Sequence, residues 1–417
     1  MSKLIVRGGK KLYGELSMYS AKNAVLPLLA ATVMADSPSR ITNCPRITDV
    51  YSMLGILEDL GCKASFDGKD VVVDPAGVCR YTITEEKARK MRSSIFLSGA
   101  LLSKYKEAVI ARPGGCDIGL RPINLHIEGL KALGVKITEE GGYVICDGKN
   151  MKGGEITLDF PSVGTTENLI MAATLIRGTT VIKNAATEPE IADLADFINK
   201  MGGKVSGGGT HKVVIEGVEK LKGVSFEPIP DRIITGTYLI AAAMCGGEIT
   251  LKNVKCGHIS SIISKLKESA CKIYVNNAKI TLISSGETKA VKNVITSPYP
   301  GFPTDLQAQT IAMESVSRGV SIVEENMFET RFRHVSELVK MGADITIRGK
   351  TAIINGVKLL HGTSVKCFDL RGGAAMVLAA MKAEGTSTVS DIYHIDRGYE
   401  SIENELKLLG ADITRTE

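Results

Sequence analysis

The strings "MGADITI" at residues 341–347 and "LGADITR" at residues 409–415 are close copies of each other and lie 68 residues apart. Four more strings of this kind occur in the chain: "LGCKASF" at 60–66, "LGVKITE" at 133–139, "MGGKVSG" at 201–207 and "SACKIYV" at 269–275. Successive copies begin 68 to 73 residues apart. A regular period of this length indicates an internal structural repeat. We therefore expect six copies of one folding unit.

Each copy is preceded by two helical patterns. The nearer pattern has apolar residues on one side only, as in "EIADLADFINK" at 190–200, which predicts a surface helix. The farther pattern is apolar and alanine-rich all round, as in "LRGGAAMVLAAMKAEG" at 370–385, which predicts a buried helix. Short strands join the helices, and a hairpin such as "KVSGGGTHKVVIEG" at 204–217 follows. The predicted unit is thus a βαβαββ arrangement in an α/β protein.

The sixth unit is incomplete, because the chain ends at "ADITRTE", residues 411–417, before a closing strand. The first residues, "SKLIVRGGKKLYG" at 2–14, resemble the closing element "TAIINGVKLLHG" at 351–362. We therefore expect the N-terminal strand to pair with the C-terminal unit. Six units divide into two domains of three: residues 22–229 form one, and residues 1–21 with 230–417 form the other.

Composition excludes several classes of protein. The net charge of +5 over 417 residues comes without a dense stripe of lysine and arginine, which argues against nucleic-acid binding. The longest apolar runs, such as "AVLPLLAATVMA" at 24–35, are too short for membrane insertion. The N-terminus has no signal-peptide pattern. Nine cysteines without a CxxC and six histidines without a close pair favour a reduced, cytoplasmic protein with no metal and no cofactor.

Polar residues mark the starts of the predicted buried helices. They are Lys22 and Asn23, Arg92, Ser162 to Gly164, Arg232, Asp305 and Arg371. Capping accounts for serine and aspartate at such positions, and Asp305 is open to that interpretation. Lysine and arginine are unfavourable at the positive end of a helix unless an anion compensates them. We therefore hypothesise a shared site for anionic ligands.

Cys116 lies in "ARPGGCDIGLRP", residues 111–122, between glycines and two flanking arginines. A metal site lacks further ligands at suitable spacing. A catalytic nucleophile needs a histidine, and His126, ten residues on, is better explained as a packing or capping residue. A redox switch stays open, because neighbouring arginines lower a thiol pKa and raise the thiolate content. A proton donor also stays open, and it requires a bound anion to raise the thiol pKa again, because a thiolate cannot donate a proton.

A series of strings runs in order along the chain from about residue 3 to residue 414. It comprises "SAKNAVLPLLAA" at 20–31, "RPGGCDIGLRP" at 112–122, "FPSVGTTEN" at 160–168, "EPEIADLA" at 188–195, "PDRIITGTYL" at 230–239, "FPTDLQAQ" at 302–309, "RFRHVSEL" at 331–338, "DLRGGAAMVLA" at 369–379 and "YHIDRGYE" at 393–400. Together they resemble the UDP-N-acetylglucosamine 1-carboxyvinyltransferase family of enolpyruvyl transferases. The resemblance implies a two-domain inside-out α/β barrel with three repeats per domain and an active site in the cleft between them. It also implies transfer of the enolpyruvyl group of phosphoenolpyruvate to the 3-hydroxyl of UDP-N-acetylglucosamine, with release of phosphate, in peptidoglycan synthesis.

The family's pattern implies a role for each matching residue. Cys116 matches the lid-loop acid that protonates C3 of phosphoenolpyruvate and reacts with fosfomycin, and Asp305 matches the base for the sugar hydroxyl. Lys22, Asn23 and Arg397 match the phosphoenolpyruvate site. The positions that hold the nucleotide sugar and the substrate anions are matched by Arg92, Arg121, Pro122, Ile123, Asn124, Leu125, Ser162, Val163, Gly164, Met327, Arg331 and Arg371.

Two positions depart from the family. Asn124 replaces a carboxylate, and Phe160 stands where some members have lysine, so neither charge is carried over. Three alternatives differ in class: the sister transferase of the shikimate pathway, a regulatory paralogue that binds nucleotide sugar without turnover, and a structural repeat protein. The sister enzyme lacks the cysteine loop, and a structural repeat leaves the cationic helix starts unexplained.

Overall fold

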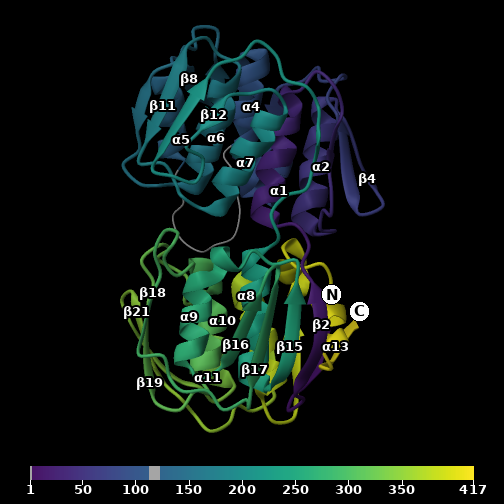
Figure 1. Cartoon of the computed structure of the whole chain (residues 1–417), viewed down its shortest axis with the longest axis vertical. Coiled ribbons are helices and arrows are strands. Elements are labelled where there is room, and N and C mark those ends of the chain that lie inside the picture. The colour runs from purple at the N-terminus through teal and green to yellow at the C-terminus, as the bar shows by residue number, and fades with distance from the viewer. Residues whose placement is uncertain (1, 112–122) are drawn as a thin grey trace. The chain divides into compact units, whose positions relative to one another are not determined.

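The computed structural model describes residues 2–111 and 123–417, with the side chains of Arg89, Lys90 and Arg92 left out (Figure 1). The described chain divides into two compact units. The first contains the residues up to Tyr19 together with Pro230–Glu417, and the second contains the described residues between Ser20 and Ile229.

The second unit, drawn from purple to teal in Figure 1, holds three four-stranded sheets together with buried and more peripheral helices. The sheets, in spatial order, are β14 (Ser225–Phe226), β3 (Ser39–Ile41), β5 (Asp70–Asp74) and β4 (Lys63–Asp67); β6 (Thr82–Ile83), β7 (Glu107–Ala111), β9 (Tyr143–Asp147) and β8 (Lys136–Glu140); and β10 (Glu155–Thr157), β11 (Thr179–Lys183), β13 (Lys212–Glu216) and β12 (Val205–Ser206). The buried helices are α1 (Lys22–Ala31), α4 (Phe96–Tyr105) and α6 (Val163–Thr174). The remaining helices are α2 (Thr48–Leu60), α3 (Glu85–Lys90), α5 (Asn124–Ala132), α7 (Pro189–Lys200), η1 (Thr32–Met34) and η2 (Arg92–Ile95).

The first unit repeats this plan. Its sheets are β2 (Leu12–Ser17), β15 (Gly247–Lys252), β17 (Lys279–Ser284) and β16 (Lys272–Asn276); β18 (Asn293–Ile295), β19 (Val320–Glu324), β21 (Thr351–Asn355) and β20 (Asp344–Arg348); and β22 (Ser364–Lys366), β23 (Thr386–Ser390), β1 (Lys3–Arg7) and β24 (Asp412–Thr416). The buried helices are α8 (Arg232–Cys245), α10 (Gln307–Glu314) and α12 (Leu370–Lys382). The others are α9 (Ser260–Glu268), α11 (Val335–Lys340), α13 (Ile402–Leu408), η3 (Cys256–Ile259), η4 (Thr304–Leu306) and η5 (Ile392–Arg397).

All six sheets share one pattern of pairing. In the sheet of β10 to β13, for example, β10 is parallel to β11, and β13 is antiparallel to both β11 and β12. This pattern confirms the predicted order of strand, buried helix, strand, surface helix and hairpin. In each unit, one sheet takes its edge strand from a distant part of the sequence: β14 pairs with β3, and β2 pairs with β15. These two strand pairings were not predicted.

The expected pairing of the N-terminal strand is confirmed. β1 is antiparallel to both β23 and β24, with Leu4 opposite Val389 on one side and Arg415 on the other. The N and C labels of Figure 1 accordingly lie close together in this unit. The first strand of the chain therefore closes the sixth repeat.

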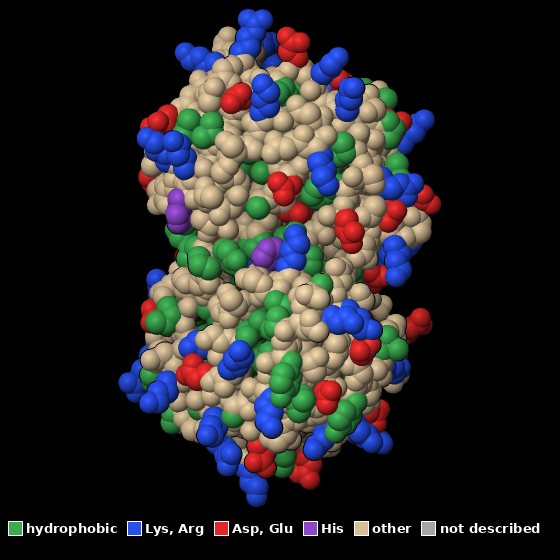
Figure 2. Space-filling model, viewed as in Figure 1, with side chains coloured by type: hydrophobic (Ala, Val, Ile, Leu, Met, Phe, Trp, Pro, Cys, Tyr) green, Lys and Arg blue, Asp and Glu red, His purple; other side chains and the backbone are tan. Residues whose placement is uncertain are grey.

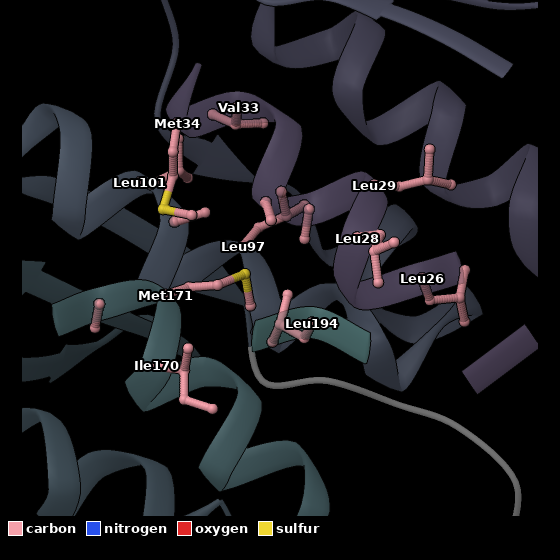
Figure 3. Close-up of a cluster of buried hydrophobic side chains, with 14 of the residues drawn as sticks. Leu26, Leu28, Leu29, Val33, Met34, Leu97, Leu101, Ile170, Met171 and Leu194 are labelled. Carbon is pink, nitrogen blue, oxygen red and sulfur yellow. The ribbon is translucent and has the colours of Figure 1, made fainter. Parts of the chain in front are cut away.

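The core of the second unit forms where the buried helices meet. Leu97 and Leu101 of α4 lie beside Met171 and Ile170 of α6, and all four side chains are fully buried (Figure 3). Gly99 makes this approach possible, because a Cβ there would lie 2.2 Å from the backbone oxygen of Asn168. Helices that are apolar all round are stable only in such surroundings.

The surface shown in Figure 2 carries basic and acidic side chains interspersed. Among the described residues, none of the helices is both long and apolar enough to cross a membrane.

Replacing Leu4 by alanine should destabilise the unit that β1 closes. Leu4 is 0 % exposed, and truncating such a residue costs about 2–5 kcal/mol of unfolding free energy. Urea unfolding followed by circular dichroism measures the change. Lys3→Ala, on the exposed face of the same strand, is the control and should stay within about 0.5 kcal/mol of the wild type. Equal unfolding midpoints for the two variants would contradict the closing role of β1.

Candidate functional site

The carboxylate of Asp305 lies between two buried arginines. Arg331 Nη2 donates to Asp305 Oδ1 over 2.7 Å, and Arg371 Nη2 donates to Asp305 Oδ2 over 3.1 Å. The arginine side chains are only 4 % exposed, whereas that of Asp305 is 27 % exposed. One negative group thus faces two positive ones where water is largely excluded, and a part of the carboxylate stays accessible.

Local sequence explains how Arg371 is held. Asp369 caps α12, and its Oδ1 accepts hydrogen bonds from the backbone N–H groups of Arg371 and Gly372 at 2.9 and 3.0 Å. Such a cap fixes the first turn of the helix and places the next side chain. Asp231 caps α8 in the same way, through the N–H groups of Ile233 and Ile234.

The charge of Arg371 is strongly stabilised. Burial alone would lower its pKa, but the carboxylate of Asp305, the hydroxyl of Tyr399 and the carboxylate of Asp231 outweigh burial and raise the pKa above its ordinary value. Tyr399 also lies below the guanidinium, with 5.8 Å from Cζ to the ring centroid, and its hydroxyl is 2.9 Å from Thr237 Oγ1. Arg371 is therefore a fixed cation.

Both arginines keep donors that have no partner among the described residues: Arg331 Nε and Arg371 Nη1 are buried and unbonded there. Buried donors are usually paired, and leaving one unpaired costs about 1–3 kcal/mol.

A buried glutamate organises the turn that carries Met327. Glu325 is 1 % exposed, and its Oε1 accepts from the N–H groups of Met327 and Phe328 at 2.8 and 3.2 Å. Its Oε2 accepts from the hydroxyl of Thr304 at 2.9 Å. Since Thr304 precedes Asp305, Glu325 connects the half-buried Met327 to the carboxylate described above.

The ring of His334 lies near Arg331 and Asp369. Its ring is buried, and neither ring nitrogen has a hydrogen-bond partner among the described residues. Burial lowers the pKa of His334 to about 4, Arg331 also lowers it, and Asp369 opposes the change. The ring is therefore neutral although Arg331 and Asp369 are both close to it.

In the second unit, Lys22 is the first residue of α1 and forms an ion pair with Asp49, in the first turn of α2. Lys22 Nζ lies 2.9 Å from Asp49 Oδ2, and the side chains are 12 % and 4 % exposed. Asn23 follows on α1 and is half-buried. A lysine at the positive end of a helix is thus compensated by a buried carboxylate.

The starts of α4, α5 and α6 meet in the same unit. Ser162 caps α6, accepting from the N–H of Thr165 at 3.3 Å, and Val163 begins the helix. A Cβ on Gly164 would lie 3.1 Å from the ring of Phe96 and 3.6 Å from that of His126. These residues therefore bring the predicted nucleotide-sugar positions 162–164 next to the start of α5.

His126 packs in this region. It is 6 % exposed, and its Nδ1 is 3.2 Å from Asn168 Nδ2. Asn168 also bonds to Ser98 and to the N–H of Gly99. This environment agrees with the packing role expected for His126.

Beside it, Ile123 is buried, Asn124 is exposed as the first residue of α5, and Leu125 is half-buried. The remaining predicted positions here lie outside the description: Cys116, Arg121 and Pro122 fall in 112–122, and only the backbone of Arg92 is described.

Arg397 is half-buried at the end of η5, between Asp396 and Gly398.

Among the predicted site residues, the structure brings Asp305, Arg331 and Arg371 into direct contact. It also gathers positions 123–125 and 162–164 in the other unit.

Two expected helix starts differ in detail. Asp305 lies in η4 before α10, and Arg92 lies in η2 before α4, so neither begins its α-helix. Asp305 pairs with arginines, and it provides no cap to η4. The expectation that it could be a plain helix cap is therefore wrong, because its oxygens are directed at guanidinium groups.

Sequence reasoning missed the supporting acids Asp49, Asp231 and Asp369. A signal was present, since Asp231 and Asp369 lie one or two residues before an arginine at a predicted helix start. Among the described residues, no group of three or more histidine, cysteine, aspartate or glutamate side chains could hold a metal ion.

Comparison with known proteins places the chain in a class. The family model for EPSP synthase (3-phosphoshikimate 1-carboxyvinyltransferase) matches residues 6–406. The chain therefore belongs to this family of carboxyvinyltransferases.

Individual relatives of the chain have names that are more specific than that of the family model. The UDP-N-acetylglucosamine 1-carboxyvinyltransferase 2 of Caldanaerobacter subterraneus subsp. tengcongensis is 52 % identical over 415 residues, covering 100 % of both chains. The UDP-N-acetylglucosamine 1-carboxyvinyltransferase 1 of Clostridium perfringens is 46 % identical, again over 100 % of both.

Solved structures agree on the fold. The enolpyruvyl transferase NikO from Streptomyces tendae has a TM-score of 0.89 at 22 % identity, covering 100 % of this chain and 99 % of its own. EPSP synthase from Acinetobacter baumannii has a TM-score of 0.77 at 16 % identity, covering 100 % of both chains. The predicted enolpyruvyl transferase fold is confirmed.

Acidification should lower the free energy of unfolding, because the buried ring of His334 is neutral in the folded protein. An unfolded chain binds a proton at this histidine near pH 6.5, whereas the folded protein does so only near pH 4. The folded state therefore loses up to about 3 kcal/mol as pH falls through this window. Urea unfolding between pH 7 and pH 4 should show a smaller loss for His334→Asn than for the wild type. The exposed His361→Asn should behave like the wild type, and parallel curves for all three would contradict a neutral buried ring.

Proposed function

We propose that the chain transfers the enolpyruvyl group of phosphoenolpyruvate to the 3-hydroxyl of UDP-N-acetylglucosamine and releases phosphate. The observation that carries the proposal is the Asp305 carboxylate held between Arg331 and Arg371. Relatives that are 45–52 % identical over their full lengths bear the name of this activity and support the choice of substrates.

The reaction needs an acid and a base. A proton adds to C3 of phosphoenolpyruvate while the sugar oxygen bonds to C2 and the hydroxyl gives up its proton. Loss of a proton from C3 and departure of phosphate then restore the double bond, so atoms and charges balance. Groups that hold or move these protons contribute about 100- to 10,000-fold each.

Asp305 is proposed as the base. A carboxylate oxygen accepts more than one hydrogen bond, so contact with the arginines does not prevent an oxygen from accepting a sugar hydroxyl. The 27 % exposure of its side chain gives the hydroxyl access. Arg331 and Arg371 keep the carboxylate in place through their hydrogen bonds to its two oxygens.

Residues of both units are proposed to bind the two substrates. Lys22, Asn23 and Arg397 are assigned to phosphoenolpyruvate, whose phosphate and carboxylate suit lysine and arginine. The nucleotide sugar is assigned to Arg92, Arg121, Pro122, Ile123, Asn124, Leu125, Ser162, Val163, Gly164, Met327, Arg331 and Arg371. Support for the second group is the packing of the starts of α4, α5 and α6 around Gly164.

Cys116 is proposed as the acid that protonates C3, delivered by closure of its loop, and as the target of fosfomycin. We place the reaction in the cytoplasm, as the first committed step of peptidoglycan synthesis. Free thiols on all described cysteines support a reducing compartment.

Phosphate release tests the proposed activity. Protein mixed with phosphoenolpyruvate and UDP-N-acetylglucosamine should release phosphate, whereas shikimate 3-phosphate as acceptor should give none. Asp305→Asn should lower kcat about 100- to 10,000-fold, because the base is lost. Asp344→Asn, a change at an exposed aspartate of β20, is the matched control. Binding of nucleotide sugar without phosphate release would favour the regulatory paralogue, and release with shikimate 3-phosphate would favour the sister enzyme.

Substitution of Cys116 tests the proton donor. Cys116→Asp should keep part of the turnover because a carboxyl group can donate a proton, while Cys116→Ser should lose nearly all of it because a hydroxyl is a far weaker acid. Steady-state kinetics and mass spectrometry after fosfomycin treatment measure both roles. Near-full turnover in Cys116→Ser, together with none in Cys116→Asp, would remove Cys116 from the proposed mechanism.

A further inference from the structure

Arg415, near the end of the chain, holds two carboxylates at once. Its Nη1 and Nη2 donate to the two oxygens of Asp396 at 2.9 and 2.6 Å. Its Nε and Nη2 donate to the two oxygens of Glu403 at 2.8 and 3.1 Å. All three guanidinium nitrogens are used, and paired charge-assisted bonds of this kind fix geometry as well as charge.

The backbone position of Arg415 is itself fixed. It lies in β24 opposite Leu4 of β1, so its strand is held by the N-terminal strand that closes the sixth repeat. Glu403 lies in the first turn of α13 and its side chain is 7 % exposed. Arg415 therefore connects the sheet of β1 and β24 to α13 through Glu403, and to the segment before α13 through Asp396.

Asp396 belongs to the segment that carries Arg397. This segment, η5 and the turn after it, is flanked by Asp391 and Ser401, which have φ values of 58° and 81°. Residues other than glycine adopt such angles uncommonly, aspartate more readily than serine, so the surroundings help to hold them. Backbone hydrogen bonds form η5 itself, such as those from the N–H groups of Gly398 and Tyr399 to the carbonyl of Ile395, and side-chain contacts add to them in setting the position of Arg397.

The inner side of this segment is packed tightly against the start of α12. A Cβ on Gly373 would lie 2.8 Å from the side chain of Ile395, and a Cβ on Gly398 would lie 2.8 Å from that of Leu370. Ile395 is fully buried. The segment is thus held by packing on one side and by the Asp396–Arg415 pair on the other, with Arg397 next to both contacts.

We propose that Arg415 is a positioning residue for phosphoenolpyruvate binding, acting through Asp396 on the neighbouring Arg397. The inference rests on the proposed function, because it takes Arg397 as a contact of phosphoenolpyruvate. In this role Arg415 acts through its contacts with Asp396 and Glu403. The closing strand of the sixth repeat thereby determines where a substrate-binding cation is held.

The energetic argument depends on geometry. Exposed ion pairs usually contribute about 0–1 kcal/mol to stability, and both Arg415 and Asp396 are 31 % exposed. Loss of the Asp396 pair alone should therefore change global stability little, whereas Arg415→Ala also leaves the carboxylate of Glu403, which is 7 % exposed, without this partner and should lower the urea midpoint further. Moving a substrate-holding group by a fraction of an ångström is more costly, since a displacement of about 1 Å can reduce rates roughly 100-fold. A change in substrate affinity without a matching change in stability is the signature of positioning.

Steady-state kinetics with both substrates test the role. Arg415→Ala should raise KM for phosphoenolpyruvate about tenfold, less than the full cost of a 1 Å displacement. KM for UDP-N-acetylglucosamine should stay nearly unchanged. Arg415→Lys should behave like alanine, because an ammonium group cannot bind two carboxylates bidentately. The double variant Arg415→Ala/Asp396→Asn should have the same KM for phosphoenolpyruvate as Asp396→Asn alone.

Arg40 offers a matched control. It also binds two carboxylates, those of Asp67 and Asp70 at 2.7 and 3.0 Å, and is 39 % exposed. Arg40→Ala should shift the urea midpoint only slightly, because its partners Asp67 and Asp70 are 66 % and 27 % exposed, and it should leave both KM values unchanged.

The outcomes separate the two levels of the proposal. If Arg397→Ala raises KM for phosphoenolpyruvate but Arg415→Ala does not, the positioning role is overturned and the proposed function stands. Equal increases in both KM values, with a lower urea midpoint, would show general loosening and overturn it as well. If Arg397→Ala leaves phosphoenolpyruvate binding intact, the assignment of Arg397 fails first and this inference fails with it.

Discussion

Positive side chains at the positive ends of helices must be compensated, and this constraint organises both units. Lys22 at the start of α1 is paired with the buried Asp49. Arg371 at the start of α12 is paired with Asp305. In each case a carboxylate from another element supplies the negative charge. These carboxylates hold the cations in fixed positions. The positive charge of each cation is therefore partly neutralised before a substrate anion binds.

In the C-terminal unit the compensating acid has a second use. Asp305 balances Arg331 and Arg371, and the same carboxylate is the proposed base for the sugar hydroxyl. Binding and proton transfer are thus coupled: whatever displaces the arginines also displaces the base. Glu325 supports this arrangement from below, through the hydroxyl of Thr304, so the group depends on several buried hydrogen bonds. Arg397 is supported differently, by packing on α12 and by the ion pair of its neighbour Asp396.

Much of the fold could be predicted from the sequence, because a period of 68 to 73 residues repeats both helix types and the hairpin. The missing strand of the sixth repeat even indicated where β1 pairs. The pairing of β14 with β3 and of β2 with β15 had no comparable signal in the sequence, since short edge strands carry little hydrophobic pattern. For the site, the polar helix starts and the resemblance both named Asp305 and Arg371, and the cap Asp369 left a local signal two residues before Arg371, but the partner Asp49 emerged only from a tertiary contact. Pairing between side chains far apart in sequence leaves no periodic trace.

The central claim is that a proton adds to C3 of phosphoenolpyruvate while the sugar 3-hydroxyl attacks C2. Running the reaction in D2O and examining the nucleotide product by NMR tests this directly. The account predicts an enolpyruvyl ether on the 3-oxygen of the sugar, with deuterium on the vinyl carbon, because the methyl group formed from C3 loses one of its hydrogens again. An ether without deuterium, or a bond to another oxygen of the sugar, would contradict it.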